Sequence, residues 1–265
     1  MEAEGVLEVQ VVQGRIALVT LAGNDAESKF AWGTRVCEHR INPILIAQVN
    51  HALDLALENK EVSAVVVAGQ GKFFSNGMDL KWIDAHPDQA DQLQADAEAL
   101  LARILTFPLP TIAAINGHFC AAGAMLGLAF DYRISVQHKA LFFVPAIHLG
   151  LIYSKGMTEL MKSKTPVHMH NELIVYGKRY TPQELEQEHV VKQLCSPEAL
   201  IAETVQFAFN LTESGKFLGQ KYRDTMRKIK TNTYQSTYTA LTDARNFQGM
   251  GFDSGSWDEH GRSKL

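Results

Sequence analysis

The chain has few cysteines and no long hydrophobic run, and each shortage excludes a class of protein. Its 265 residues include only three cysteines, Cys37, Cys120 and Cys195. They are odd in number and too far apart for a disulfide framework or a metal site, so we expect reduced, buried thiols. No uninterrupted apolar run approaches the roughly 20 residues that a bilayer span requires, so no membrane partner is expected.

An excess of positive charge is also missing. The 25 Lys and Arg residues are outnumbered by 29 Asp and Glu, for a formal net charge of −4, which argues against a nucleic-acid partner. The hydrophobic share of 46% is enough for a large core and excludes general disorder. The acidic, strand-like residues 1–14 show neither a secretory nor a mitochondrial targeting pattern. A soluble intracellular globular protein is expected.

Strand and helix patterns alternate through the first two thirds of the chain. Residues 9–21 alternate in polarity and predict two strands joined by a tight glycine turn, whereas residues 24–42 lack periodicity and predict an extended loop. The other elements expected here are a helix from Pro43, buried strands at Ala64–Ala68, Thr111–Ile115 and Tyr132–Val136, and helices at Ala90–Leu105 and residues 121–130. This alternation predicts an α/β fold.

The chain becomes helical in its last third. Residues 181–184 form a capping box, and a further helix is expected from Ser196-Pro197. We therefore expect an α/β core over residues 1–195 and a helical region with a polar tail over residues 196–265. A lone helical appendage would expose the apolar stripe of this helix, which monomers avoid. Its members are Leu200, Ile201, Val205 and Phe209.

Two stretches combine a strand end, a turn of small residues and a helix start. They are residues 71–80 (GKFFSNGMDL) and residues 110–125 (PTIAAINGHFCAAGAM). Such turns leave backbone N–H groups unpaired, with a helix N-terminus behind them. Side by side, two such turns would direct two donors at one carbonyl oxygen, as an oxyanion hole does. The alternative is that the glycines and alanines only allow a helix to pack closely on a sheet.

These motifs resemble those of a known family. FFSNGMDL, PTIAAINGH and AAGA, in this order and followed by Asp131-Tyr132, are similar to the motifs of the crotonase (enoyl-CoA hydratase/isomerase) superfamily. Within it, the similarity is greatest to plant-type peroxisomal Δ3,Δ2-enoyl-CoA isomerases, which have an E-x-R before the first helix, matched here by Glu38-His39-Arg40. The resemblance covers roughly residues 9–195.

The resemblance implies a crotonase-like spiral of ββα units, with a C-terminal helical region that forms a homo-trimer or a dimer of trimers. It implies acyl-CoA as the bound molecule, with no separate cofactor because CoA is part of the substrate, and no metal. Met78 and Ala122 would supply the two backbone N–H groups of the oxyanion hole. The remaining candidate substrate-binding residues are Ser75, Asn76, Gly77, Asp79, Leu80, Gly123, Met125, Ala146 and Tyr153.

The catalytic carboxylates depart from the family pattern. Hydratases of the superfamily carry two glutamates, and the match places these positions at Met125 and Ala146. Neither side chain can activate water, so hydration by the family mechanism is not expected. Isomerases keep the second glutamate, which is missing here as well. The sequence therefore lacks the usual base of the isomerase subgroup.

His148 is the candidate base. Dienoyl-CoA isomerases and many plant-type isomerases carry an Asp two residues beyond the second glutamate, at the position of His148, and an imidazole can move protons at neutral pH. The alternative is a histidine that packs near the site without chemistry. Tyr153 could line the acyl pocket or pack in the core, and Asp79 is expected to cap backbone N–H groups. His118 is expected to be structural.

The leading functional prediction is an acyl-CoA isomerase of fatty-acid β-oxidation that converts a 3-enoyl-CoA into the trans-2-enoyl-CoA. The alternatives are a non-catalytic acyl-CoA-binding homologue and another reaction of the superfamily, such as dienoyl-CoA isomerisation or thioester hydrolysis. Ser263-Lys264-Leu265 reads as a peroxisomal address in a eukaryote. The expected location is therefore peroxisomal if the source is eukaryotic and otherwise cytoplasmic.

Overall fold

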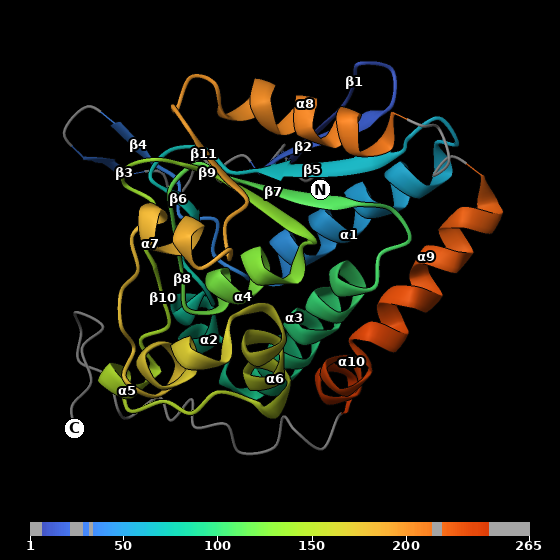
Figure 1. Cartoon of the computed structure of the whole chain (residues 1–265). Coiled ribbons are helices and arrows are strands. Elements are labelled where there is room, and N and C mark those ends of the chain that lie inside the picture. Colours follow the sequence, from blue (N-terminus) through green and yellow to red (C-terminus); the bar gives the residue numbers. More distant parts are fainter. Residues whose placement is uncertain (1–6, 22–28, 32–33, 214–218, 244–265) are drawn as a thin grey trace.

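A six-stranded mixed sheet forms the centre of the molecule (Figure 1). The computed structural model describes residues 7–21, 29–31, 34–213 and 219–243. Strands β1 and β2 are antiparallel, and every later neighbour in this sheet is parallel. In spatial order the strands are β1 (Leu7–Val12), β2 (Ile16–Leu21), β5 (Ala64–Ala68), β7 (Thr111–Ile115), β9 (Tyr132–Val136) and β11 (Gln193–Cys195).

A second, smaller sheet accompanies the first. Its three strands run in the order β10 (Phe142–Phe143), β8 (His118–Cys120) and β6 (Phe73–Ser75), and they are parallel to one another. The chain thus repeats one unit: β5, β7 and β9 lie in the large sheet, and β6, β8 and β10 follow them in the small one, each before a helix. This repetition confirms the expected spiral of ββα units.

Helices cover both faces of the large sheet. In Figure 1, α8 lies over one face, and α1, α3 and α4 lie beneath the other. The helices are α1 (Pro43–Glu58), α2 (Leu80–Ala85), α3 (Ala90–Leu105), α4 (Ala122–Ala129), α5 (Ala146–Leu149), α6 (Lys155–Lys164), α7 (Pro182–Gln187), α8 (Leu200–Thr212), α9 (Gln220–Thr233) and α10 (Gln235–Thr242). Short 3₁₀ turns occupy Pro87–Gln89 and Val167–Met169, and a π-helical turn occupies Asn171–Val175.

Local signals explain where the predicted helices begin. Asn42 caps α1 by accepting a hydrogen bond from the Leu45 N–H at 3.0 Å, and Pro43 occupies the first turn, where its missing N–H costs nothing. At α7, Thr181 and Glu184 form the predicted capping box. The strands expected at Ala64–Ala68, Thr111–Ile115 and Tyr132–Val136 and the helix expected at Ala90–Leu105 have the predicted bounds.

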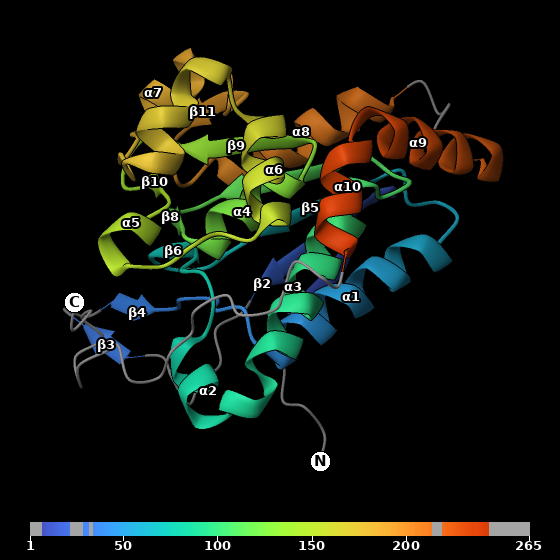
Figure 2. The same cartoon turned by 90° about the horizontal axis from the view of Figure 1, so that it is seen from below.

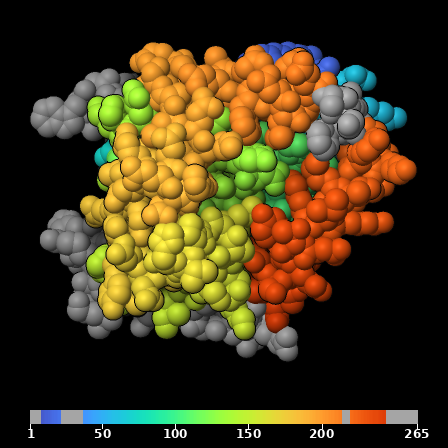
Figure 3. Space-filling model, in the orientation of Figure 1, coloured from blue at the N-terminus to red at the C-terminus, as the bar shows by residue number. Residues whose placement is uncertain are grey.

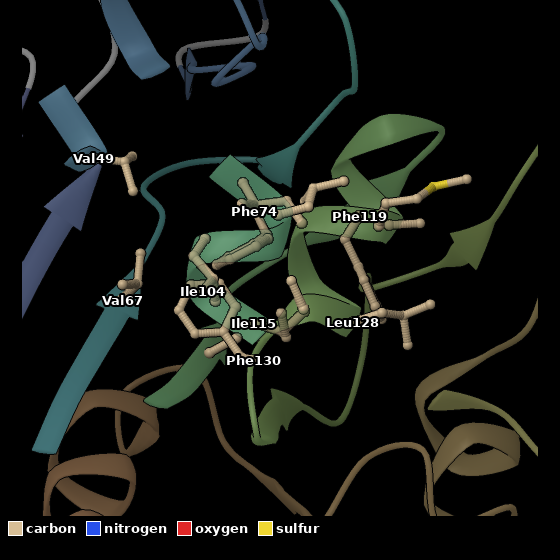
Figure 4. Close-up of a cluster of buried hydrophobic side chains, with 14 of the residues drawn as sticks. Val49, Val67, Phe74, Ile104, Ile115, Phe119, Leu128 and Phe130 are labelled. Carbon is tan, nitrogen blue, oxygen red and sulfur yellow. The ribbon is translucent and has the colours of Figure 1, made fainter. Parts of the chain in front are cut away.

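The hydrophobic core lies between the sheets and the helices beneath them. Figure 4 shows Phe74 of β6, Ile104 of α3 and Phe119 of β8 converging on this space. All three side chains are fully buried, and each contributes about 1.5–3 kcal/mol relative to an exposed position. Helix α4 is buried along its whole length, as its lack of polar residues predicts. The turns that precede α2 and α4 therefore stand on a rigid base.

The sequence predicted an extended loop over residues 24–42, but part of this segment forms strands. Two short antiparallel strands, β3 (Lys29–Ala31) and β4 (Thr34–Val36), form a separate two-stranded sheet at the edge of the molecule (Figure 2). Strands of three residues are too short to show a period-two pattern, which explains the error.

The apolar stripe of α8 covers this chain's own sheet. Leu200 and Val205 are buried against the strands beneath them, and α8 packs on β2, β5, β7 and β9. The stripe therefore gives no support to the predicted trimer, because a second copy is not needed to cover it. The helix also begins at Leu200, a turn later than Ser196-Pro197 predicted.

Helix α9 extends along the side of the molecule and is anchored by a partly buried ion pair. The Lys230 ammonium donates to the Asp131 carboxylate at 2.6 Å and to the Leu109 carbonyl at 3.0 Å. A hollow of about 560 Å³ lies between α8 and α9, lined in part by Tyr132 and Tyr222. Figure 3 shows it between the orange and red parts of the surface. No helix of the described residues is long and apolar enough to cross a bilayer.

Candidate active site

The two strand–turn–helix motifs lie side by side because β6 and β8 are parallel neighbours in the small sheet. After β6 the chain turns at Gly77, whose φ is +82°, and α2 begins at Leu80. After β8 it turns at Ala121, and α4 begins at Ala122. Parallel neighbours end at the same edge of a sheet, so both turns face the same space.

Glycine lets the two turns touch. A Cβ at Gly77 would lie 2.9 Å from the Ala121 Cβ and 3.1 Å from the Ala122 nitrogen. A Cβ at Gly123 would lie 2.3 Å from the Ser75 carbonyl oxygen, which is closer than real atoms approach. These two glycines are therefore required for the close approach, and the packing role considered above is real. The close approach also places the backbone at Gly77 against the Ala122 nitrogen.

Within the described residues, the backbone N–H groups of Met78 and Ala122 are both unpaired. Ile41 bridges to the first turn, but its N–H donates to the Gly77 carbonyl and its own carbonyl accepts from Asp79, which leaves the Met78 N–H out of the bridge. Ala122 is the first residue of α4 and has no acceptor within the helix. Neither N–H donates a hydrogen bond to any described residue.

Ala121 holds an unusual backbone conformation beside this pair. Its φ is +50° and its ψ is −131°, a region that residues with a Cβ rarely adopt. Strain of this kind costs about 1–3 kcal/mol and persists where the surrounding structure imposes it. Here it orients the first N–H of α4, where the partial positive charge of the helix N-terminus is concentrated.

Met78 and Ala122 both line one apolar pocket of about 240 Å³. Of the candidate residues from the sequence, the structure brings Asn76, Met78, Leu80, Ala122, Ala146 and Tyr153 to its wall. The rest of the lining is Arg40, Gln94, Cys120, Ala121, Phe143, Pro145, Leu149, Leu151, Ile152 and Met157. A long apolar wall with two convergent backbone donors fits an acyl group whose carbonyl oxygen sits at the turns.

Four candidate residues that do not line the pocket support the two turns from behind. Asp79 caps α2 as expected, accepting hydrogen bonds from the Trp82 N–H at 3.1 Å and from the Asn42 amide at 3.0 Å. The buried Ser75 hydroxyl donates to the His39 carbonyl at 2.7 Å. Gly77 and Gly123 act through the contact between the turns. Met125 is fully buried inside α4 and does not line the pocket.

Tyr153 is the polar group closest to the position of the missing glutamate. Its hydroxyl oxygen accepts a hydrogen bond from the Ala146 N–H at 2.8 Å. Burial raises the pKa of Tyr153 to about 12, although this hydrogen bond opposes the rise. The phenol is therefore protonated at neutral pH and can act as a donor but not as a base.

The structure does not bring His148 to the pocket. The side chain is exposed, and its Nε2 lies against the backbone of Gly177, 3.1 Å from where a Cβ of that glycine would be. Side chains two residues apart on a helix differ in direction by about 200°. Because Ala146 faces the pocket, His148 on the same helix faces away from it. Counting along the sequence could not show this, because α5 was not among the predicted elements.

Among the described residues, no carboxylate or imidazole side chain lines the pocket. Its titratable residues are Arg40, Cys120 and Tyr153. The Cys120 thiol donates to the Asn76 side-chain oxygen at 2.9 Å, and burial raises its pKa to about 11, so it is not a thiolate at neutral pH. All three cysteines are free and buried, as predicted. The described residues contain no cluster of His, Cys, Asp or Glu able to hold a metal ion.

Sequence reasoning missed the part of the wall that comes from α3 and α6. Gln94 and Met157 line the pocket, and Gln94 donates at 2.7 Å to Glu98, one helical turn along α3. Both polar residues are buried. The available signal was a Gln and a Glu four residues apart on the apolar face of a helix. His118 is structural as predicted, since its Nδ1 accepts from the Leu141 N–H at 3.0 Å.

Comparisons with known proteins agree with this geometry. The family model described as "Enoyl-CoA hydratase/isomerase" matches residues 38–253. Enoyl-CoA delta isomerase 3 of Arabidopsis thaliana is 30% identical over 224 residues, covering 82% of this chain and 88% of the relative. The 2,3-dehydroadipyl-CoA hydratase of Escherichia coli K12 is 26% identical over 196 residues, covering 74% and 76%.

A solved structure shows the same fold. An enoyl-CoA hydratase/isomerase family protein from Pseudomonas syringae superposes with a TM-score of 0.78 at 24% identity, over 92% of this chain and 98% of that one. The matched family segment includes both turns and every residue that lines the pocket. The chain belongs to the enoyl-CoA hydratase/isomerase family.

Proposed function

We propose that the protein is an acyl-CoA isomerase that converts a 3-enoyl-CoA into the trans-2-enoyl-CoA. The observation that carries the proposal is the pair of unpaired N–H groups, Met78 and Ala122, at one end of an apolar pocket. The names of two relatives support the same reaction: Enoyl-CoA delta isomerase 3 and Enoyl-CoA delta isomerase 2, peroxisomal, of Arabidopsis thaliana.

The chemistry follows from what two backbone donors can stabilise. The thioester oxygen of the substrate accepts hydrogen bonds from the Met78 and Ala122 N–H groups. Loss of a C2 proton then places negative charge on that oxygen, in a dienolate, and return of a proton at C4 completes the shift of the double bond. Each donor of this kind contributes about 3 kcal/mol to the transition state in comparable sites. Side chains are not required for this part, so apolar Met and Ala suffice.

Hydration is the reaction that the pocket supports least. Addition of water needs a group that activates it, and the two family positions for that group are Met125, buried away from the pocket, and Ala146. The hydratases among the relatives therefore do not lead us to propose hydration for this chain.

The decisive experiment gives the purified protein two substrates. We expect trans-3-hexenoyl-CoA to be converted into its trans-2 isomer, and we expect no hydration of crotonyl-CoA above a heat-inactivated control. Hydration of crotonyl-CoA would show that the two glutamate positions have been misassigned.

A second candidate is a non-catalytic acyl-CoA-binding protein, favoured by the pocket wall that lacks a carboxylate and an imidazole. Isothermal titration with a saturated acyl-CoA measures binding, and an isomerase assay with a 3-enoyl-CoA then separates the two candidates. Binding without any turnover of 3-enoyl-CoA would support the non-catalytic protein, and binding with turnover the isomerase.

We also propose a place in peroxisomal fatty-acid β-oxidation. Ser263-Lys264-Leu265, which lies outside the described residues, and the peroxisomal names of two Arabidopsis relatives support this location. A fluorescent protein fused to the N-terminus should enter peroxisomes of eukaryotic cells, and removal of Leu265 should leave it in the cytosol. Import that survives this deletion would refute the signal.

A further inference from the structure

Glu98 is a buried acid where three helices meet. Its side chain is fully buried on α3, and one carboxylate oxygen, Oε2, faces Gly156 of α6. A Cβ on Gly156 would lie 2.2 Å from that oxygen and 2.9 Å from the Cα of Leu241 in α10. Figure 2 shows α3, α6 and α10 packed together at this place. The missing side chain of Gly156 is what makes room for the carboxyl.

The carboxyl has no cation to balance it within the described residues. Oε1 accepts one hydrogen bond, from the Gln94 amide at 2.7 Å, and Oε2 has no hydrogen-bond partner in the described part of the chain. Burial raises the pKa of Glu98, while the Ser154 hydroxyl and the Gln94 amide act in the opposite direction. An unbalanced buried acid is costly to keep, and such groups are concentrated at functional sites.

One hydrogen bond connects this acid to the pocket wall. The Gln94 amide that donates to Glu98 also contacts the Met157 sulfur at 3.7 Å. Gln94 and Met157 both line the pocket that holds the Met78 and Ala122 donors. Both side chains are unbranched and can change rotamer. The carboxyl thus lies directly behind a movable part of the wall.

We propose that Glu98 is the proton acceptor of the isomerisation, reached when the bound acyl chain displaces the Gln94 side chain. The inference rests on the proposed function, and it identifies the base that neither Ala146 nor the outward-facing His148 can provide. Two carboxyls hydrogen-bond to residues of the pocket wall: Glu38, which is paired with the Arg40 guanidinium, and Glu98, which has no cation partner among the described residues. Glu98 comes from a helix that carries neither of the family's glutamate positions.

The proton and electron balance of the step is simple. The C2–H bond breaks, its proton joins the ionised carboxylate, and its electron pair enters the dienolate held by the two N–H groups. The carboxylic acid then gives the proton to C4, and the carboxylate is restored. A carboxyl with a raised pKa suits both proton transfers, because it binds the C2 proton more firmly than an exposed glutamate and still releases it to C4.

The groups around Glu98 determine which titrations can appear in the pH profile of the reaction. Gln94 on its own helix and Ser154 at the start of α6 are its polar contacts, and no charged group contributes to its raised pKa. The titratable groups of the pocket are Arg40, Cys120 and Tyr153, and the pKa values of Cys120 and Tyr153 lie at about 11 and 12. The acid limb of the pH profile, above the ordinary glutamate range, therefore reports on the carboxyl, and Lys164→Met removes the separate contribution of Lys164, whose pKa is about 7.

The test compares Glu98→Gln with a matched control, Glu203→Gln. Glu203 on α8 also accepts from a glutamine amide, that of Gln193, but lies on the opposite face of the large sheet from α3. Two rates are measured: isomerisation of trans-3-hexenoyl-CoA, and exchange of C2 hydrogen for deuterium in butyryl-CoA in heavy water. The second rate needs proton abstraction but no double bond.

We expect E98Q to lose about 10²- to 10⁴-fold in both rates, E203Q to lose neither, and butyryl-CoA binding to persist in all three proteins. Full activity in E98Q, or its loss in H148A instead, would overturn the inference and leave the isomerase intact. Deuterium exchange that depends on Glu98 without isomerisation would uphold the proton acceptor and refute the reaction. Wild-type protein with neither rate would refute both.

A further variant protects the test against misfolding. Glu98→Asp keeps the acid but withdraws it by one methylene, so it should recover part of the rate that E98Q loses. If E98Q fails to fold, the pH profile of the wild-type protein decides: kcat/KM should fall as pH decreases through a pKa above the ordinary glutamate value. A profile that stays flat at every pH above the ordinary glutamate range would contradict the role of Glu98.

Discussion

Gly77 and Gly123 are the residues whose missing side chains let the two turns meet. The contact between the turns positions the Met78 and Ala122 donors, so the site depends on the absence of a Cβ at both glycines. A donor that belongs to the backbone cannot be removed by changing its own side chain. The geometry can instead be disturbed from the neighbouring glycine.

Gly123→Ala should disturb both the fold and the site. The new Cβ would lie 2.3 Å from the Ser75 carbonyl oxygen, so the backbone must shift, at a cost of about 1–3 kcal/mol of the free energy of unfolding. Butyryl-CoA binding should weaken by at least about tenfold if one donor moves out of line, which corresponds to about 1.4 kcal/mol.

Urea unfolding and calorimetric titration measure the two effects. Gly219→Ala is the control, because its Cβ would meet nothing closer than the Tyr222 ring at 3.5 Å. Equal effects of the two substitutions would argue against the contact between the turns as the cause.

Tyr153→Phe tests the hydroxyl beside Ala146. The substitution leaves the Ala146 N–H without its acceptor and should destabilise the protein by about 1–2 kcal/mol. Because the pKa of Tyr153 is raised to about 12, the wild-type phenol is un-ionised at both pH 6 and pH 9, and the loss should be the same at the two values. Denaturation curves at the two values check this, and a loss confined to one of them would mean that another group titrates there.

At the scale of the elements, the ββα units were largely predictable from the sequence. Buried strands such as Ala64–Ala68 are short, β-branched and bounded by glycine, and α3 has a clear apolar face. The strands of the small sheet were not predicted as such, because two or three residues carry no periodicity. The identity of the motifs nevertheless located both donor turns.

The polar part of the pocket was not predictable, because it depends on how helices pack. His148 was chosen by counting from Ala146, and the direction of α5 turns it away. Gln94 and Glu98 lie four residues apart on α3, and their burial depends on the cover that α6 and α10 provide. A glycine on a different helix, Gly156, creates the space for the carboxyl, and no local pattern in α3 can show this.

Lys164 joins the end of α6 to α10 and should make stability depend on pH. Its ammonium donates to the Tyr234 hydroxyl at 3.1 Å and lies 4.2 Å from the centre of that ring. Burial, reinforced by the charge of Arg133, lowers the pKa of Lys164 to about 7. Between pH 10.5 and pH 7 the unfolded chain therefore binds a proton that the folded protein does not. This lysine lowers stability progressively as pH falls across that window.

Lys164→Met removes the titration. The variant should gain stability relative to the wild type as pH falls from 10 to 7, as read from urea midpoints at both values. Lys162→Met, on the same helix but exposed and paired with Glu159, is the control and should change stability by less than about 1 kcal/mol at either pH. If the urea midpoints at pH 10 and pH 7 differ by as much in K164M as in the wild type, another residue causes the pH dependence.

At the scale of the whole molecule, assembly stays a prediction. The stripe of α8 is used inside the chain, but α9 presents Tyr222 and Ile229 at 49% and 59% exposure, beside the hollow that Figure 3 shows. Light scattering at micromolar concentration should give the mass of a trimer or a hexamer. If α9 forms the contact, Ile229→Lys should lower that mass, whereas a wild-type mass of 29.4 kDa would identify a monomer.

The most direct test of the whole account is a crystal structure of the protein with a bound, non-reactive acyl-CoA analogue. The account predicts that the carbonyl oxygen of the acyl group lies within about 2.7–3.1 Å of both the Met78 and the Ala122 nitrogen atoms. Its acyl chain should lie along the apolar wall, with the Gln94 side chain moved from its present rotamer. A carbonyl oxygen that contacts neither nitrogen, with the acyl chain outside this pocket, would contradict the oxyanion hole and the function built on it.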